Sequence, residues 1–181
     1  NHRNPTNFVL NGRPMGRLEG FSAPLVAQEG VRWLKEVRDR KKPFLLSVWT
    51  HEPHLPIESA EEFMKPYAGI KDEGIRQHHG NITQLDHAFG ILMKALDELG
   101  LRNDTVVFFT SDNGPAAPYT RTSSHSGVGT GGPFRGKKWT LYEGGIRMPL
   151  IIRWPGHVAA GAVDNDSVIG MVDFLPTLCS L

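Results

Sequence analysis

The segment 108–115, FFTSDNGP, places an acid and an amide directly after an apolar run. Asp112 and Asn113 carry side-chain oxygens, and oxygen is the ligand atom that hard cations such as Ca²⁺ select. The same residues are good turn formers, and Gly114-Pro115 would complete a turn. These residues therefore indicate either a cation site or a plain turn at the end of a buried strand.

A second polar cluster, THEPH, follows the apolar run FLLSVW at residues 44–49. Its His51 and His54 are able to exchange protons near neutral pH, although each also suits an ordinary loop. Ligands of an open parallel sheet bind outside the carboxyl ends of its strands. If the two apolar runs form parallel neighbouring strands, we expect both polar clusters to face one crevice.

The long segment 114–137 is rich in Gly, Ser and Pro and has no helix or strand pattern. Such loops inside compact domains are usually functional or disordered. Four side chains in or just after this segment are cationic or titratable: His125, Arg135, Lys137 and Lys138. They suit a solvated surface, but beside a bound cation they would hold an anionic, oxygen-rich group. The residues alone thus predict an anion and metal site. The remaining candidates, His78, His79, Asp86 and His87, lack metal-ligand spacing and are interpreted as structural.

The elements that must position these residues alternate between helices and strands. Helices are expected at 22–40, near 59–67, from about Gly74 or Gln77 to Glu98, and from Asp173 onward. Ser22 is the candidate N-cap of the first helix, and Gly100 ends the long one. Apolar runs at 44–49, 104–110 and 148–156 are expected to be strands, the first covered on both faces. This order predicts an α/β domain with a mostly parallel sheet.

Composition excludes several classes of partner. Lys plus Arg number 20 against 19 acids, so nothing indicates nucleic acid or an anionic membrane as a partner. The chain has one cysteine, Cys179, and therefore no internal disulfide. None of its apolar runs approaches the roughly 18 residues of a membrane span. The 181 residues suffice for one domain with a real core.

Several stretches in the right order resemble the sulfatase family, in particular arylsulfatase and N-acetylgalactosamine-6-sulfatase-like members. They are THEPH, GNITQLDHAFGILMKALDELGLRNDTVVFFTSDNG, FRGKKWTLYEGGIRMPLIIRWPG and VDFLPTL, and they span roughly residues 40–180. TSDNG followed by K-x-x-x-Y-E-G-G-I-R-x-P is specific to that family. The resemblance implies the fold of the alkaline-phosphatase-like superfamily, in which helices sandwich the sheet.

The resemblance also implies roles in sulfate-ester hydrolysis. Asp112 and Asn113 would supply two protein ligands of a Ca²⁺ ion, and two further aspartates would come from the first strand of the family's domain. His51 would contact the sulfate and help to protonate the leaving oxygen. The family lysine lies four residues before the aromatic residue of YEGG, which here makes it Lys138, and it would bind a sulfate oxygen.

The same resemblance suggests further substrate contacts, at residues whose motifs are less specific to the family. His125 and Arg135 lie in the loop that shapes substrate pockets, and they are candidate substrate contacts. His54 is a second-choice site residue. The implied substrate is a sulfated small molecule or glycan, and sulfatases commonly work outside the cytoplasm, in the periplasm, the lysosome or the medium.

One departure from the family pattern concerns the nucleophile. Sulfatases use a formylglycine made from the cysteine or serine of a C-x-P-S-R-type motif, and this sequence has none; Cys179 stands in TLCSL. Residues 1–181 are therefore interpreted as part of a catalytic domain, without the nucleophile-bearing N-terminal part and the smaller C-terminal subdomain. The chain alone is expected to be inactive, with sheet strands that lack partners. Two alternatives are a phosphatase or phosphodiesterase of the same superfamily and a non-catalytic, anion-binding pseudo-enzyme.

Overall fold

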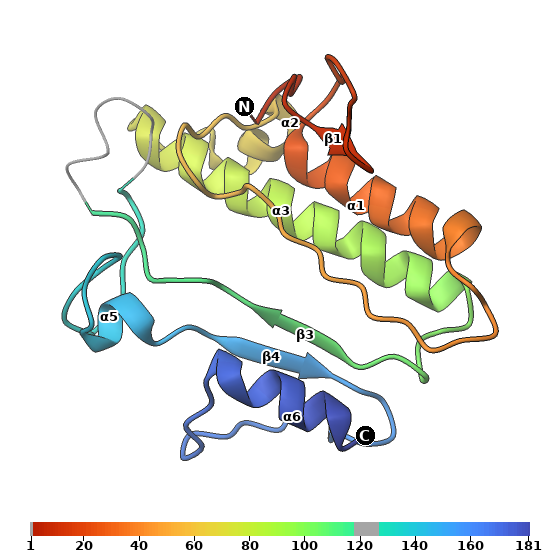
Figure 1. Ribbon diagram of the computed structural model, residues 1–181. Coiled ribbons are helices and arrows are strands. Elements are labelled where there is room, and N and C mark those ends of the chain that lie inside the picture. The colour runs from red at the N-terminus through yellow and green to blue at the C-terminus, as the bar shows by residue number, and fades with distance from the viewer. Residues whose placement is uncertain (1, 118–126) are drawn as a thin grey trace.

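The computed structural model describes residues 2–117 and 127–181. A pair of long helices lies over a two-stranded ribbon, and a short helix near the C-terminus covers the other side of that ribbon (Figure 1). The elements in chain order are β1 (Val9–Leu10), β2 (Arg13–Pro14), α1 (Ser22–Arg32), the π-helical turn η1 (Trp33–Val37), α2 (Glu61–Met64), η2 (Lys65–Tyr67), α3 (Glu73–Glu98), β3 (Val107–Thr110), α5 (Glu143–Ile146), β4 (Leu150–Arg153), η4 (Met171–Asp173) and α6 (Phe174–Cys179).

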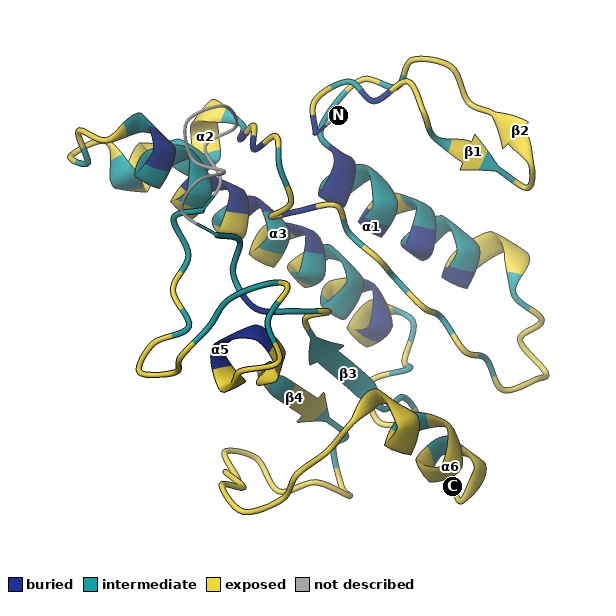
Figure 2. Ribbon diagram, turned by 60° about the vertical axis from the view of Figure 1, so that its left-hand side comes forward, coloured by how far each residue is buried: buried dark blue, intermediate teal, exposed yellow. Residues whose placement is uncertain are grey.

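The core lies where α1 packs against α3. Ala23 and Ala27 sit four residues apart on one face of α1 and meet Ala88 of α3, and all three are almost fully buried. These small side chains let the two helices approach closely, and larger apolar side chains of α3 close the contact around them. Figure 2 shows the buried residues gathered along the facing sides of α1 and α3.

The long helix α3 ends at Glu98, as its sequence predicts, and begins at Glu73, just before the predicted start at Gly74 or Gln77. At its start, the Asp72 carboxylate accepts a hydrogen bond of 3.0 Å from the Ile75 backbone amide, which is a side-chain N-cap. At its end, Gly100 adopts φ +70°, a left-handed conformation that costs glycine nothing. The predicted helix up to Glu98 with Gly100 as its stop is therefore confirmed.

The strands β3 and β4 pair antiparallel, with Phe108 opposite Ile152 and Phe109 opposite Ile151. Successive side chains of a strand point to opposite faces. Accordingly Phe109 packs on Phe89 of α3 with ring centroids 5.2 Å apart, and Phe108 packs on Phe174 at 5.1 Å. Helices thus cover both faces of β3, and the two apolar runs that predicted strands there are confirmed.

The apolar run 44–49 corrects an expectation, because it forms no strand in the structure. Its burial alternates, with Leu46 and Val48 near Gly30 of α1 on one side and Leu45 and Trp49 on the other, 78% and 86% exposed. A β-ladder needs a neighbouring strand, and within the described residues none pairs with this run. One face is therefore covered rather than two.

The parallel arrangement of strands is also absent from the part of the chain that the structure describes. Both two-stranded sheets, β1–β2 and β3–β4, are antiparallel. The run 44–49 and β3 cross Figure 1 in the same direction, but no backbone ladder joins them. Among the described helices, none combines the length and apolar character needed to cross a bilayer.

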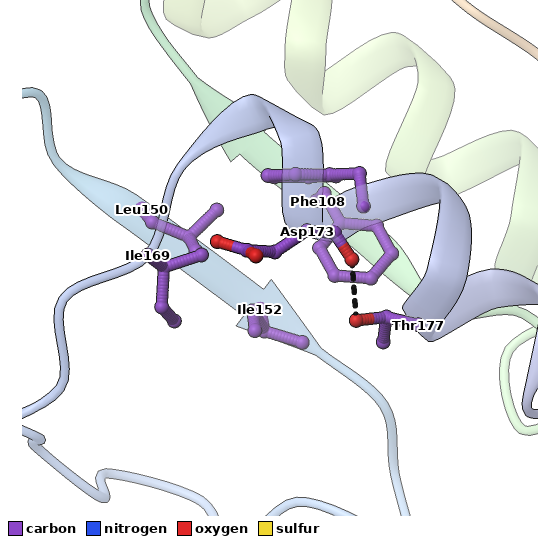
Figure 3. A pocket seen from close by; sticks show the side chains of 7 residues that line it. Phe108, Leu150, Ile152, Ile169, Asp173 and Thr177 are labelled. Atoms are coloured by element: carbon purple, nitrogen blue, oxygen red, sulfur yellow. Dashed lines mark hydrogen bonds between the residues drawn. The ribbon is translucent and has the colours of Figure 1, made fainter.

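An apolar pocket lies between the β3–β4 ribbon and α6 (Figure 3). Its walls include Phe108, Ile152 and Phe174, and it contains no Lys, Arg or His. The polar groups of Asp173 are used locally, because its side chain accepts from the Gly170 amide at 2.7 Å and its carbonyl accepts from the Thr177 hydroxyl at 2.6 Å. This pocket therefore offers no cation for an anionic substrate.

Candidate functional site

The turn after β3 carries the two predicted metal ligands. Asp112 is exposed, and Asn113 is half-buried. The Asn113 side-chain amide nitrogen donates to the Gly114 carbonyl at 2.9 Å, which leaves the side-chain oxygen as an acceptor. Two oxygen donors side by side fit part of a Ca²⁺ coordination sphere. Within the described ranges, no cluster of three or more His, Cys, Asp or Glu side chains suits a metal ion.

This turn is locked to the segment around α5 by a close backbone contact. The Gly114 amide donates to the Gly145 carbonyl at 2.9 Å, and the Gly144 amide donates to the Arg135 carbonyl at 2.8 Å. A Cβ atom at Gly114 would clash with the Gly144 carbonyl oxygen. Glycine is required at Gly114 and at Gly144, because a Cβ atom at either position would meet a backbone carbonyl oxygen. The YEGG motif therefore serves to dock two loops against each other.

The same contact places Lys138 beside the turn. Its backbone amide donates to the Pro115 carbonyl at 3.0 Å. The neighbouring Lys137 uses its ammonium group to donate to the Gly129 carbonyl at 2.8 Å. By contrast, the half-buried Lys138 side chain makes no hydrogen bond or ion pair with any residue that the structure describes. Of the two lysines, Lys138 has the ammonium group available for an anion.

Arg135 lies on this segment too, but its guanidinium group packs on an aromatic ring. It lies 4.0 Å from the centroid of Tyr142, a cation–π contact that leaves the N–H donors at the edge of the group accessible. Arg147 braces the α5 turn, with hydrogen bonding to Glu143 at 3.0 Å and its guanidinium over Phe134 at 4.6 Å. These contacts tie Arg147 to its own turn. The candidate His125 lies outside the described residues.

The second candidate cluster is the turn from His51 to His54. The His54 amide donates to the His51 carbonyl at 2.8 Å, and both side chains are exposed. Their ring centroids lie 5.3 Å apart, and the His51 ring lies 4.6 Å from that of His2. Partial desolvation at the turn lowers the pKa of His51, and the neighbouring His2 and His54 lower it further by electrostatic repulsion, while Glu52 acts in the opposite direction. The neutral imidazole is therefore favoured.

Glu52, between these histidines, is a residue that sequence reasoning missed. It is only 4% exposed. One of its carboxylate oxygens, Oε1, accepts from the Ser22 hydroxyl at 2.8 Å, the Ala23 amide at 2.9 Å and the Gln84 side chain at 3.1 Å. Burial alone would raise the pKa of Glu52, but His2 and these donors outweigh it and lower the pKa to about 2. The carboxylate is consequently ionised in the folded chain.

These contacts correct the predicted cap of α1. The N-cap position is Phe21, whose side chain makes no capping hydrogen bond, and Ser22 is the first helical residue. The Ser22 hydroxyl instead points to Glu52, which caps the helix from a distant segment and complements the helix dipole. In the sequence, Glu52 appears only as an acid in the polar segment THEPH. Its neighbours along the chain do not distinguish a buried capping carboxylate from a solvated one.

Helix α3 lies behind both clusters. Gln84 is fully buried and binds Glu52 with its amide nitrogen and the Ala60 amide with its oxygen, at 3.1 and 3.0 Å. Nearer the start of the same helix, His78 lies beside Gly129, which belongs to the loop that leads to Lys138. No hydrogen bond within the described residues joins the two clusters directly. The helix is therefore the element that fixes both relative to the core.

Comparison with known proteins gives consistent matches. The family model described as Sulfatase matches residues 2–181. Bovine arylsulfatase A (Bos taurus) is 36% identical over 148 residues, covering 82% of this chain and 27% of the relative. Mouse N-acetylgalactosamine-6-sulfatase (Mus musculus) is 33% identical over 171 residues, covering 93% of this chain and 31% of the relative. This chain thus spans less than a third of the length of either relative.

A solved structure is similar as well. The crystal structure of Ps i-CgsB in complex with k-i-k-neocarrahexaose superposes with a TM-score of 0.72 at 27% sequence identity. The match covers 83% of this chain and 32% of that one. Most of this chain therefore shares its fold with part of a larger protein.

Proposed function

Because this chain belongs to the sulfatase family, we propose that it forms part of the catalytic domain of an enzyme that hydrolyses sulfate esters. The observation that carries the proposal is the joining of two motifs in space. The Lys138 amide donates to the Pro115 carbonyl, so the backbone of Lys138 lies next to the Asp112-Asn113 turn, and no described residue pairs with its ammonium group. Cationic and metal-binding groups side by side suit a sulfate ester, whose reaction develops negative charge on the sulfuryl oxygens.

Asp112 and Asn113 are the residues that would hold Ca²⁺. Their side-chain oxygens fit two positions of such a site, and the other ligands would come from residues outside this chain. A bound Ca²⁺ would supply electrostatic stabilisation of the developing charge. Lys138 would add a fixed positive charge at a sulfate oxygen and orient the group, with the backbone contacts at Gly114 and Gly144 keeping the lysine near the metal ligands.

His51 would act on the leaving oxygen. Its pKa is lowered by burial and by its histidine neighbours, so the ring gives up a proton readily once it is protonated. Neither ring nitrogen is hydrogen-bonded to a described residue, and each remains able to face substrate. His54 stands next to it, with its Nδ1 near the Leu55 carbonyl at 2.9 Å and its Nε2 as a further substrate contact. Arg135, and His125 from the loop, remain candidate contacts to the rest of the substrate.

The nucleophile in this proposal lies outside the present sequence, which contains no C-x-P-S-R-type motif. A formylglycine from such a motif would provide the attacking oxygen. Residues 1–181 alone would then bind ligands without turning them over. We also expect the mostly parallel sheet to form with strands outside this chain; the apolar faces of Leu45 and Trp49 support this, since both are more than three-quarters exposed at 78% and 86%.

The substrate class that we favour is a sulfated glycan. Relatives of this chain include an N-acetylgalactosamine-6-sulfatase, and a similar structure was solved with k-i-k-neocarrahexaose. The exposed polar and aromatic side chains of the α5 segment, Arg135 and Tyr142 among them, suit a large hydrated ligand better than an apolar one. By the same family analogy, the protein would work outside the cytoplasm.

The experiment that tests the proposal begins with the coding sequence upstream of Asn1. A continuous reading frame with C-x-P-S-R is expected, and the protein from that frame should release sulfate from sulfated saccharides and from an aryl sulfate. A Ser or Thr in another context, together with phosphate release from phosphate esters, would favour a phosphatase or phosphodiesterase. A frame that has no nucleophile, with Ca²⁺ and sulfate bound by the chain itself, would favour the non-catalytic pseudo-enzyme.

A further inference from the structure

The burial of Glu52 needs an explanation beyond helix capping. Carboxylates are rarely buried, since removal of a charge from water is costly unless the group is well paired. Here a single oxygen, Oε1, accepts three hydrogen bonds, from Ser22, Ala23 and Gln84. These donors belong to α1 and α3, so the carboxylate joins both core helices at one point. A local N-cap residue would satisfy α1 without bringing in a remote loop.

The remote loop is the turn that holds His51. His2 lies with its Nδ1 3.5 Å from Glu52 Oε1 and donates from Nε2 to the His54 carbonyl at 2.5 Å. The His54 amide in turn donates to the His51 carbonyl at 2.8 Å. The turn is thus attached to α1 and α3 by the Glu52 side chain, and to His2 at the His54 carbonyl. The two attachments lie close together, because the His2 ring is next to the Glu52 carboxylate.

The His51 side chain, by contrast, has no anchor of its own. Its ring makes no hydrogen bond to a described residue, and it lies beside the rings of His2 and His54. The orientation of the ring therefore depends on the backbone on either side of it. That backbone is held by Glu52, the next residue along the chain.

We propose that Glu52 is a positioning residue for His51, whose buried carboxylate fixes the His51–His54 turn to the N-terminus of α1 and to Gln84 of α3. The inference rests on the proposed function in one respect only, the role of His51 in chemistry. The attachment of the turn is a property of the folded chain itself. In this role Glu52 acts through the placement of its neighbour.

The first test measures attachment without any activity. Glu52→Gln keeps the reach and an accepting oxygen but removes the charge, whereas Glu52→Asp keeps the charge and is too short to reach all three donors. Leu34→Ala serves as a matched destabilising control, because Leu34 is 1% exposed and lies in η1, away from the turn. Hydrogen exchange of the His54 amide is compared with that of the Ala88 amide in the core of α3.

The expected result is local. Both Glu52 variants should speed exchange of the His54 amide by about tenfold more than that of the Ala88 amide, since the turn opens without the core. Leu34→Ala should speed exchange of the Ala88 amide. It should speed exchange of the His54 amide by no larger a factor. Equal acceleration of the two amides in the Glu52 variants, as in the control, would overturn the proposal.

The second test uses the active protein from the complete reading frame and a double-mutant cycle. Glu52→Gln should lower kcat with a smaller change in KM, and in a His51→Ala background it should cause no further loss of kcat. A general structural defect would lower activity by the same factor in both backgrounds, and this result would overturn the positioning role. If the wild-type protein releases no sulfate, the proposed function fails, while the exchange comparison still decides whether Glu52 holds the turn.

Discussion

The backbone amide of Lys138 lies 3.0 Å from the carbonyl oxygen of Pro115 and donates a hydrogen bond to it. This bond joins the loop before α5 to the turn after β3, two segments that are separated in sequence by the long Gly-rich stretch. The Gly114 amide and the Gly145 carbonyl form a second bond of 2.9 Å between the same segments. The candidate metal ligands and the candidate sulfate lysine are therefore held as one unit by main-chain contacts.

Gly114→Ala should break this unit. The added methyl group would clash with the Gly144 carbonyl oxygen, and two backbones would have to separate. We expect a loss of about 1–3 kcal/mol of unfolding free energy, measured by urea denaturation, together with weaker Ca²⁺ binding. Gly90→Ala is the matched control, because nothing lies within 4 Å of its added Cβ on the exposed side of α3. The control should be neutral or stabilising; equal losses in both variants would contradict the docking role of Gly114.

Asp112→Asn should weaken Ca²⁺ binding by at least about tenfold, since affinity for this ion follows the number of charged ligands. Titration calorimetry with CaCl₂ on the protein from the complete reading frame measures the effect. Asp104→Asn changes an exposed aspartate before β3 and should leave the affinity unaltered. If the two variants bind Ca²⁺ as well as the wild type, the turn after β3 is only a turn.

Lys138→Ala and Lys137→Ala form a second matched pair. Lys138 has no partner among the described residues, so its loss should lower kcat/KM for a sulfate ester by about a hundredfold and leave stability nearly unchanged. Lys137 donates to the Gly129 carbonyl at 2.8 Å, so its loss should cost about 1 kcal/mol of stability with a smaller effect on kcat/KM. Steady-state kinetics and thermal unfolding of both proteins check this, and the reverse ranking would assign the sulfate contact to Lys137.

Stability at low pH should depend on Glu52. Its pKa falls from 4.5 to about 2 on folding, so the ionised group stabilises the fold at pH values above 4.5. That contribution, about 3 kcal/mol at most, is lost as the pH falls from 4.5 toward 2. Urea denaturation at several pH values should show a shallower acid loss for Glu52→Gln than for the wild type. Glu61→Gln, at an exposed position of α2, is expected to follow the wild-type curve.

His78 should add a pH dependence nearer neutrality. Burial lowers its pKa below 6.5 and the charge of His79 lowers it further, so the unfolded chain binds a proton before the folded chain does. Stability is therefore present above pH 6.5 and is lost as the pH falls through the lowered pKa of the folded state. Urea midpoints at pH 7.5 and 5.5 should differ less for His78→Gln than for the wild type. If the difference between the two midpoints is the same in His78→Gln and in the wild type, the pH dependence does not come from His78. His51, whose pKa is also lowered on folding, would then be its source.

Local chemistry in the sequence was enough to predict the long helix α3 and the strands β3 and β4. Gly100 marked the end of α3, and apolar runs marked β3 and β4, because helix termination and burial of a short run are properties of neighbouring residues. The order of motifs identified the family and separated Lys138 from Lys137. The site roles of Asp112 and His51 stay predictions, which rest on residue types that carry the chemistry and on the family motifs.

Contacts between distant segments decided the rest. The cap of α1 is supplied by Glu52 instead of Ser22, β3 pairs antiparallel with β4, and the run 44–49 has one covered face and no ladder. Each of these outcomes depends on which groups meet in space, and a period of apolar residues does not encode its partner. A buried carboxylate and a solvated one look alike in sequence, since only the donors around Glu52, from α1, α3 and His2, make its burial favourable.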